Sequence, residues 1–297
     1  MISLTRARCA AFVLSLGALP AFAIEGGVDT YGLGAEGTLA GGLPPPGLYG
    51  IVYQNHYQAD RFADDDGHSA IPGFRVRADS VTPRLIWMTR TTIAGGELGY
   101  YALMPLIHLR VSVPGMSESR TGNGDLLVAP LLAYHSGMFH WGYAFELVLP
   151  VGDYDKSHLA NLGRNYVTVR PIAGWSFHDP AGWDVSTKLS VSINARNGDT
   201  AYRSGSYLAG DYTVGYRVLP RVLLGLEGYF LDQFSDDKLQ GASVDGNGNR
   251  TKVLGVGGGL QYQAPSGYSV EGKVVRDTNV RNRSDGTSLW VRAAWKF

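Results

Sequence analysis

The chain has 297 residues, enough for one large domain or two small ones. Charged residues make up only 18%, whereas 40 glycines and 17 tyrosines favour strands and tight turns over surface helices. Because Lys plus Arg and Asp plus Glu number 26 each, the chain lacks the large basic field that nucleic-acid binding needs.

The N-terminus has the pattern of a secretory signal peptide. Arg6 and Arg8 precede an apolar run over residues 9–19, and Ala21-Phe22-Ala23 follows as a small-x-small cleavage motif. A spanning helix needs about 18 to 20 apolar residues, so this run is too short to be a membrane anchor. We predict that residues 1–23 are the signal peptide. Since Cys9 is the only cysteine, the mature chain would have no thiol for catalysis or zinc binding.

Residues 24–46 are rich in glycine and end in three prolines, which is typical of an extended segment. We expect either a periplasmic leader or a small hatch that folds into the domain after it. Gly32–Gly37 has the spelling of a dinucleotide-binding fingerprint, but no buried strand precedes it and prolines stand where its helix should run. We interpret this stretch as flexible leader sequence.

From residue 47 onward, apolar and polar residues alternate in segment after segment, as in strands. In Trp183–Asn194 the odd-numbered residues are apolar apart from Thr187, and the even-numbered ones are polar or charged. Half-buried sheets of soluble sandwiches alternate in the same way. We predict strands near residues 48–59, 74–90, 96–113, 123–135, 139–151, 165–178, 182–195, 205–217, 221–235, 251–264, 268–280 and 287–297.

The connections between these strands distinguish a membrane barrel from a sandwich. Those near 91–95, 136–138, 179–181, 218–220 and 265–267 are short, and those near 60–73, 114–122, 152–164, 196–204, 236–250 and 281–286 are mostly long and polar. Up-and-down transmembrane barrels have short periplasmic turns, longer external loops and an even number of strands. The sequence therefore predicts an all-β fold, a transmembrane up-and-down antiparallel β-barrel of about twelve strands over residues 47–297.

Aromatic residues gather near the short turns on the apolar face of these strands. Such a ring is the aromatic girdle that transmembrane barrels place at the membrane–water boundary. High β-propensity also puts aromatic residues into strands, but it does not predict clustering at one end. The predicted girdle contains Tyr134, Trp141, Tyr143, Trp175, Phe177, Trp183, Tyr216, Tyr262, Tyr268 and Trp295.

The C-terminus alternates apolar and polar residues up to a terminal Phe297. A last strand of this form closes a barrel against the first strand and resembles the signal that the outer-membrane assembly machinery reads. We predict that Trp295 and Phe297 are part of that assembly signal.

Charged residues on the polar face predict what lines the channel. Arg or Lys facing lipid near mid-membrane costs about 2 to 4 kcal/mol, so these side chains must point inward. If the loop around His158 closes symmetrically, Glu146 faces Arg170 as an ion pair in the lumen. The predicted pore lining is Glu146, Arg170, Lys188, Asp211, Glu227, Glu271, Lys273 and Arg292, with Lys296 at the end of the chain.

No motif predicts catalysis or a cofactor. The seven histidines lack metal-ligand spacing, and no G-x-S-x-G or H-E-x-x-H motif is present. Asp245–Asn249 imitates the start of a calcium loop, but Arg250 occupies its required glycine and Val256 its required glutamate. We interpret residues 64–66, three aspartates, as a solvated acidic loop. We expect no enzyme activity, no cofactor and no metal site.

Several motifs resemble those of one known family. They are Leu149–Asp155, Asn161–Tyr166, Asn197–Thr200, Tyr202, Ser204-Gly205, Asp211, Gly228-Tyr229, Gln233, Asp236-Asp237, Gly248-Asn249-Arg250 and Asn282–Phe297. Together they resemble the outer-membrane transporter proteins of the phenol-degradation meta-pathway family, with one departure at Val167, where an aromatic residue is expected. Members usually accompany genes for aromatic catabolism, so the resemblance implies uptake of hydrophobic or aromatic compounds. It brings no catalytic residues.

We therefore expect a channel in the outer membrane of a Gram-negative bacterium that passively admits small hydrophobic or aromatic compounds. Its partners would be outer-membrane lipids, the outer-membrane assembly machinery and the small-molecule substrate, with no nucleic acid. Three alternatives stay open: a general diffusion pore for small solutes, a barrel enzyme, and a surface-binding protein that acts through its external loops.

Overall fold

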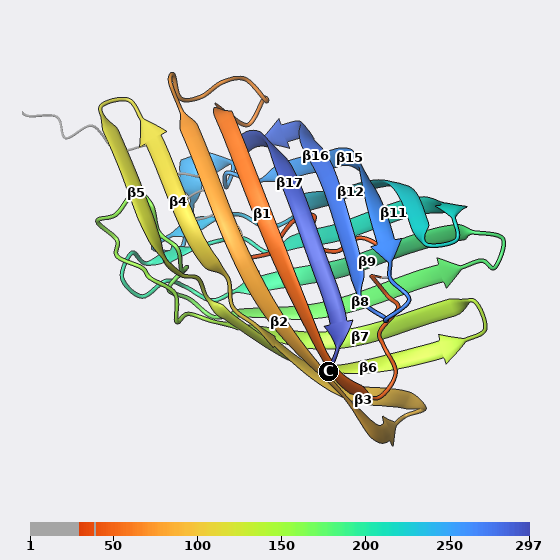
Figure 1. Cartoon of the computed structure of the whole chain (residues 1–297). Helices are drawn as coiled ribbons and strands as arrows, with labels where there is room; N and C mark the ends of the chain where they lie inside the picture. The colour runs from red at the N-terminus through yellow and green to blue at the C-terminus, as the bar shows by residue number, and fades with distance from the viewer. Residues whose placement is uncertain (1–29, 39) are drawn as a thin grey trace, which may run out of the picture.

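Residues 47–297 form an antiparallel barrel in the computed structural model, which describes residues 30–38 and 40–297 (Figure 1). Its wall contains β1 (Gly47–Ala63), β2 (Arg75–Ile93), β3 (Gly96–Leu103), β4 (Leu106–Val113), β5 (Met116–Asn123), β6 (Leu126–Ser136), β7 (Phe139–Leu149), β8 (Thr168–His178), β9 (Trp183–Asn194), β11 (Tyr207–Leu219), β12 (Val222–Gln233), β15 (Lys252–Gln263), β16 (Ser269–Arg281) and β17 (Arg283–Lys296). The sheet order is β1-β17-β16-β15-β12-β11-β9-β8-β7-β6-β3-β2-β4-β5, and the pairing of β1 with β2 closes the barrel.

Two barrel strands are interrupted by a bend. β3 leads into β4 across Met104 and Pro105, and both pair with the long β2. β5 leads into β6 across residues 124–125; β5 pairs with β4, and β6 pairs with β3. The fourteen strands of the sheet thus build a wall of twelve, which confirms the predicted fold class.

The wall has its apolar side outside and its polar side inside. On β9, Trp183, Leu189 and Ile193 are exposed, whereas Ser190 and Asn194 are buried within the barrel. Water-filled or polar interiors and apolar outer bands are the pattern of barrels whose solvent is lipid. The apolar face of each strand therefore points outward, whereas in a soluble sandwich the apolar face packs into a core.

Two predicted external loops are absent because the strands continue through them. Residues 114–122 were expected to be a loop, but β4 and β5 form a hairpin joined by Pro114 and Gly115. Gly115 has φ +78°, which a tight turn needs and other residues rarely adopt. At residues 281–286, only Asn282 separates β16 from β17, and its φ of 52° lies in the left-handed region that asparagine tolerates. β17 thus begins before the predicted residue 287.

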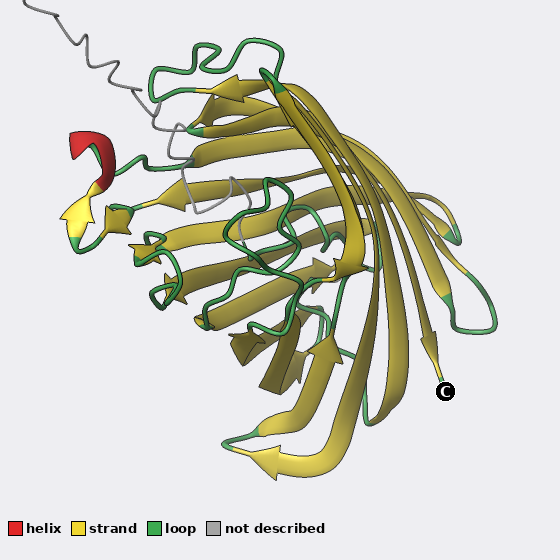
Figure 2. Cartoon of the chain, turned by 90° about the vertical axis from the view of Figure 1, so that its left-hand side faces the viewer, coloured by secondary structure: helices red, strands yellow, loops and turns green. Residues whose placement is uncertain are grey.

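The remaining long connections carry small elements of their own. β10 (Tyr202–Arg203), β13 (Lys238–Leu239) and β14 (Ala242–Ser243) form a three-stranded sheet beside the barrel. The short 3-10 helix η2 (Val244–Gly246) follows β14, and Figure 2 shows it outside the wall. Among the described residues no helix has the length and apolar character to cross a membrane.

One edge of the wall is covered by a loop instead of a strand. β5 pairs with β4 alone, and the loop at 150–167 packs against it. Asp153 N donates to Asn123 O at 3.0 Å, and Ala160 N donates to the Glu118 carboxylate at 2.9 Å. His158 also bonds Glu118. The loop therefore satisfies part of the backbone that a neighbouring strand would otherwise pair.

The predicted signal peptide, residues 1–23, lies outside the described residues, and so do residues 24–29 and 39. Residues 30–38 and 40–46 run through the inside of the barrel (Figure 1). Tyr31 and Leu33 belong to a buried apolar cluster with Tyr207, Tyr229, Leu231 and other residues of β11, β12, β15 and β16. This N-terminal segment is therefore packed against one side of the lumen, which corrects our interpretation of Gly32–Gly37 as flexible leader sequence.

Candidate functional site: the barrel lumen

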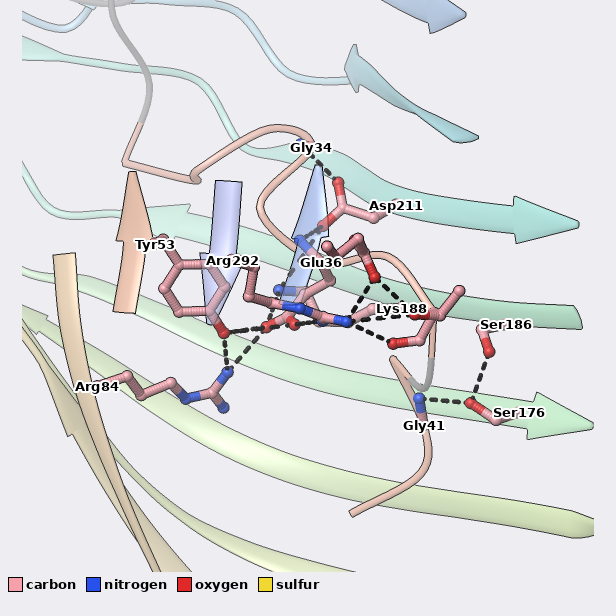
Figure 3. Close-up of polar contacts among 12 residues, drawn as sticks. Gly34, Glu36, Gly41, Tyr53, Arg84, Ser176, Ser186, Lys188, Asp211 and Arg292 are labelled. Atoms are coloured by element: carbon pink, nitrogen blue, oxygen red, sulfur yellow. Dashed lines mark hydrogen bonds and ion pairs between the residues drawn. The ribbon is translucent and has the colours of Figure 1, made fainter. Parts of the chain in front are cut away.

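Asp211 on β11 holds the N-terminal segment inside the barrel. Its carboxylate accepts hydrogen bonds from the backbone N of Gly34 at 2.8 Å and the backbone N of Glu36 at 3.2 Å (Figure 3). It also accepts one from the Tyr31 hydroxyl at 3.0 Å. Asp211 is fully buried. A buried carboxylate without donors is strongly unfavourable, so these three bonds both satisfy Asp211 and fix the path of the segment.

The next residues of the segment come close to the wall. A Cβ at Gly37 would lie 2.0 Å from Oε1 of Glu271, so only glycine leaves room for this carboxylate. Thr38 Oγ1 donates to Glu271 Oε2 at 2.6 Å, and Gly41 N donates to Ser176 Oγ at 2.8 Å. The glycine-rich composition of the segment thus has a steric reason: the chain passes through a lumen that is already filled with side chains.

Glu36 stands at the centre of the lumen and gathers cations from three strands (Figure 3). One of its carboxylate oxygens lies 2.8 Å from Arg84 Nη1 of β2 and 3.4 Å from Lys188 Nζ of β9, and the other lies 3.5 Å from Arg292 Nη1 of β17. The Tyr53 hydroxyl of β1 donates to Glu36 at 3.4 Å. These residues define the charged waist of the lumen, where one carboxylate from the segment pairs with three cations from across the barrel.

Two further ion-pair groups flank the charged waist. Lys273 lies 3.1 Å from Glu227 and 3.5 Å from Glu271, and Arg292 Nη2 lies 2.7 Å from Glu271. Glu146 pairs with Arg170, its direct partner in the β7–β8 register, which confirms the predicted ion pair.

All eight charged residues predicted to line the pore have their side chains inside the barrel. Glu146, Arg170, Asp211, Glu227, Glu271 and Lys273 are buried there, and Lys188 and Arg292 are partly exposed. Lys296 lies at the end of the barrel that carries the short turns, with its Nζ over the Tyr49 ring at 5.6 Å. Most of the lining set is therefore engaged in ion pairs or in holding the segment.

Four side chains of the lumen were not among the predicted residues: Glu36, Arg84, Tyr53 and Tyr101, whose hydroxyl donates to Glu146 at 2.7 Å. Alternation along β2 would have placed Arg84 inside, since its neighbours Leu85 and Trp87 are apolar and exposed. Glu36 has no such signal, because the segment around it has no strand periodicity. Its isolation as a single acidic residue within Gly32–Gly37 was the available hint.

The aromatic residues predicted to form a girdle lie on the outer wall near the short turns. Tyr143, Trp175, Trp183, Tyr216, Tyr262 and Tyr268 are exposed, and Tyr134, Trp141, Phe177 and Trp295 are half-buried. Several touch each other: Tyr134 stacks on Trp141 with ring centroids 5.5 Å apart, and Trp183 meets Tyr216 at 5.1 Å. Phe297, the second residue of the predicted assembly signal, follows Trp295 and is exposed.

A cavity of about 610 Å³ runs through the lumen alongside the N-terminal segment. Near the long loops it is bordered by an external apolar pocket, which we define as Phe62, Ile71, Phe74, Val76, Leu109 and Leu162. It then passes the charged waist. Toward the short turns it meets a second apolar group that includes Ile86, Leu131 and Leu43 of the segment. The passage is thus apolar at both ends and charged in the middle.

The loops above the external apolar pocket are ordered by buried acids. Asp125 accepts from the backbone N of Gly152 at 3.0 Å and of Arg164 at 2.9 Å. Asp237 accepts from Tyr202 at 2.6 Å and from Gln233 at 2.7 Å. At the loop surface, hydrogen bonds from Ser157 hold the pKa of Asp155 below its usual value. These bonds connect loops that are far apart in the sequence.

Within residues 30–38 and 40–297, no three or more His, Cys, Asp or Glu side chains are grouped so that they could hold a metal ion. The Asp245–Asn249 stretch forms η2 and the turn after it, where Asn249 donates to Asp245 at 3.1 Å.

Comparisons with known proteins agree with this architecture. The crystal structure of the COG4313 outer membrane channel from Pseudomonas putida F1 superposes with a TM-score of 0.75 and 21% identity, covering 86% of this chain and 97% of that one. The β domain of the Bordetella autotransporter BrkA has a TM-score of 0.50 at 11% identity, covering 86% and 100%. The CymD monoaromatic hydrocarbon channel has 0.45 at 9% identity, covering 86% and 89%.

No curated protein matches the sequence. The family model described as "Putative MetA-pathway of phenol degradation" matches residues 59–293, which span most of the barrel. The first solved structure above shares the barrel fold with this chain over nearly its whole length. The chain belongs to the family of the putative MetA pathway of phenol degradation and has the outer-membrane β-barrel fold.

Proposed function

We propose that this protein is a channel in the outer membrane of a Gram-negative bacterium through which small hydrophobic or aromatic molecules enter passively. The observation that carries the proposal is the cavity that joins the external apolar pocket to the periplasmic end beside the N-terminal segment. Membership of a family named for phenol degradation supports an aromatic substrate.

The external apolar pocket provides the first binding step. Phe62, Phe74 and Leu109 present apolar surface to the cavity, and burying apolar surface yields about 25 cal/mol per Å². A solute the size of a single aromatic ring could be held there without a hydrogen bond. Binding of this kind is weak and lets the solute leave again, which passive conduction requires.

The charged waist does not oppose an apolar solute as strongly as unpaired charges would. Glu36, Asp211 and Glu271 together face the three cations Arg84, Lys188 and Arg292. Glu146 compensates Arg170. Because the cavity passes beside these ion pairs, a solute meets paired and not isolated charges there. It then reaches the apolar group around Ile86. The N-terminal segment acts in this proposal as a hatch that narrows the lumen and excludes larger solutes.

The test is uptake by intact cells, because toluene crosses a simple phospholipid bilayer unaided. A deletion strain carrying the wild-type gene should take up radiolabelled toluene faster than the empty strain, with little change for radiolabelled arabinose. Leu109→Lys places a charge in the external apolar pocket and should slow toluene uptake several-fold. Leu239→Lys, the same change at an exposed position of β13 outside the barrel, is the matched control and should not slow toluene uptake.

Faster arabinose entry without faster toluene entry would contradict the proposal and favour a general diffusion pore. Toluene uptake that is equal for Leu109→Lys and wild type, at equal amounts of folded protein, would remove the external apolar pocket from the pathway.

A further inference from the structure

Three arginines cluster on the lipid-facing side of the wall, toward the long loops. Arg75 and Arg77 lie on β2 and Arg110 lies on β4, and all three are exposed. Arg77 is directly opposite Arg110 in the pairing of β2 with β4, and Arg75 is opposite Ser112. Like charges directly opposite each other on one sheet face destabilise it. An anion bound from outside the chain would offset this repulsion.

Within the described part of the chain, none of these three arginines forms an ion pair. Two acidic residues share this part of the wall, Asp60 on β1 and Asp79 on β2. Asp79 is bonded to Nδ1 of His56 at 2.7 Å, and Asp60 forms no ion pair. Neither carboxylate therefore lies within ion-pair distance of the arginine cluster.

Two other exposed cations on the wall are compensated within the chain. Lys252 on β15 is directly opposite Asp232 on β12, with Nζ 3.0 Å from Oδ2. Arg276 on β16 lies 2.8 Å from Asp285 on β17. Directly opposite residues thus carry opposite charges at Asp232 and Lys252, but like charges at Arg77 and Arg110. The arginine cluster differs from these two pairs because like charges, Arg77 and Arg110, face each other in it.

The cluster lies just above the apolar band. Val81 and Leu106 are opposite each other, outward-facing and exposed, and they mark the last apolar row on these strands. Arg77 is four residues further along β2, about 13 Å along the strand at 3.3 Å per residue. Because barrel strands tilt by about 35 to 45°, its height above the band is smaller than that. A height of this size above the apolar band places Arg77 at the level of the lipid head groups.

We propose that Arg75, Arg77 and Arg110 bind the phosphorylated head group of a glycolipid of the outer leaflet, the bis-phosphorylated glucosamine disaccharide of lipid A. Arginine presents a planar fork that matches a phosphate with two hydrogen bonds. Two polar residues flank the cluster: Ser119 is opposite Arg110, and Gln58 is opposite Arg77. Their hydroxyl and amide groups would form hydrogen bonds with a sugar. The acyl chains would lie along Val81 and Leu106.

The proposal uses the orientation assigned above but does not depend on transport, so lipid binding and toluene uptake can fail independently. The purified mature protein in detergent is titrated with bis-phosphorylated lipid A, with its phosphate-free form and with phosphatidylglycerol, and bound lipid is measured by native mass spectrometry. The test variant is Arg77→Gln combined with Arg110→Gln. Arg90→Gln, at an exposed arginine near the other end of β2, is the matched control.

We expect wild type and Arg90→Gln to retain lipid A, and the double variant to bind it about tenfold more weakly or less, since each lost contact is charge-assisted. Neither phosphate-free lipid A nor phosphatidylglycerol should bind as tightly, and an excess of orthophosphate should not displace lipid A. Equal binding by the double variant would overturn the proposal. So would equal binding of the phosphate-free lipid or of phosphatidylglycerol, or displacement by orthophosphate.

A second measurement distinguishes loss of binding from misfolding. In detergent without lipid A, the double variant should unfold at the same or a higher temperature than wild type, because the repulsion between Arg77 and Arg110 is gone. Added lipid A should raise the unfolding temperature of wild type and not that of the double variant. A double variant that is less stable without lipid and is stabilised equally by it would contradict the proposal.

Discussion

Glu146 and Arg170 show how a single pair of residues joins two strands inside this barrel. They are 4% and 1% exposed, so water screens neither charge. Arg170 Nε also donates to Ser192 at 2.9 Å, and the Tyr101 hydroxyl donates to Glu146 at 2.7 Å. Removing one partner of a buried pair leaves the other charge without compensation, which is worse than removing both.

Glu146→Gln should therefore lower the free energy of unfolding by about 3 to 5 kcal/mol. The double variant with Arg170→Gln should lose less than the sum of the two single changes, because no uncompensated charge remains. Urea unfolding of the protein in lipid vesicles, followed by tryptophan fluorescence, measures this coupling. Additive losses would mean that the two charges are screened from each other by water in the lumen.

The residue scale also shows what the sequence could predict and what it could not. Glu146 and Arg170 were placed face to face because both lie in regular strands whose alternation and register can be counted. Glu36 contacts Arg84, Lys188 and Arg292, which lie far from it in the sequence. Arg292 is separated from it by most of the length of the chain. Closure of the barrel alone brings these residues together, and no local pattern carries that information.

The N-terminal segment is the element that occupies part of the lumen. Its path depends on close backbone contacts as well as on the Asp211 carboxylate. A Cβ at Gly41 would lie 2.3 Å from the backbone N of Trp175, closer than any real contact of this kind. Since Trp175 lies within β8, the wall is unable to move aside, and the segment itself must shift.

Gly41→Ala should therefore loosen the segment without changing any charge. We expect a larger single-channel conductance in planar bilayers and more frequent fluctuations between levels. Gly198→Ala is the matched control, because a Cβ there meets nothing within 4 Å. If Gly41→Ala conducts like wild type, the segment does not limit the current.

β17 is the element that closes the wall, since it pairs with β1 on one side and β16 on the other. Phe297 N donates to Leu48 O at 3.0 Å, and its ring meets Trp295 at 5.8 Å, yet the side chain is mostly exposed. Its burial contributes little to packing. A role for Phe297 would therefore lie in assembly, at the edge where the last strand is joined to the first.

Deletion of Phe297 should reduce the folded, heat-modifiable fraction in outer membranes while leaving the stability of correctly inserted protein nearly unchanged. Semi-native electrophoresis of membrane fractions measures the first, and thermal unfolding of the purified folded form measures the second. Equal folded fractions for the deletion and wild type would show that the terminal aromatic residue is not part of an assembly signal.

Elements with strong periodicity could be predicted, and those without it could not. β9 and β7 were recognised at nearly their observed bounds because apolar and polar residues alternate throughout. β5 was missed because residues 116–123, Met-Ser-Glu-Ser-Arg-Thr-Gly-Asn, read as a polar loop. Its outward face carries Ser117, Ser119 and Thr121, which suits a strand above the apolar band better than one inside it.

At the scale of the whole molecule, the two ends of the barrel differ in chemistry. The short turns lie beside Tyr134, Trp141 and Trp183, whereas the long loops are ordered by Asp125 and Asp237. In the orientation proposed here the long loops face the outside. The family motifs at 149–155, 161–166, 197–200 and 236–237 fall in or beside these loops, so these four motifs come together at one end of the barrel.

Single cysteines test this orientation, because Cys9 is the only cysteine and lies in the predicted signal peptide. Three cysteines are placed in exposed loops at one end of the barrel, as Asp65→Cys, Ser157→Cys and Asn247→Cys. A fourth, Met138→Cys, lies in an exposed turn at the other end of the barrel. On intact cells a membrane-impermeant maleimide should label the first three and spare Met138→Cys. After the outer membrane is permeabilised, all four should react, which shows that each cysteine is accessible. Labelling of Met138→Cys on intact cells, with protection of the other three, would invert the barrel and place both the external apolar pocket and the arginine cluster on the periplasmic side.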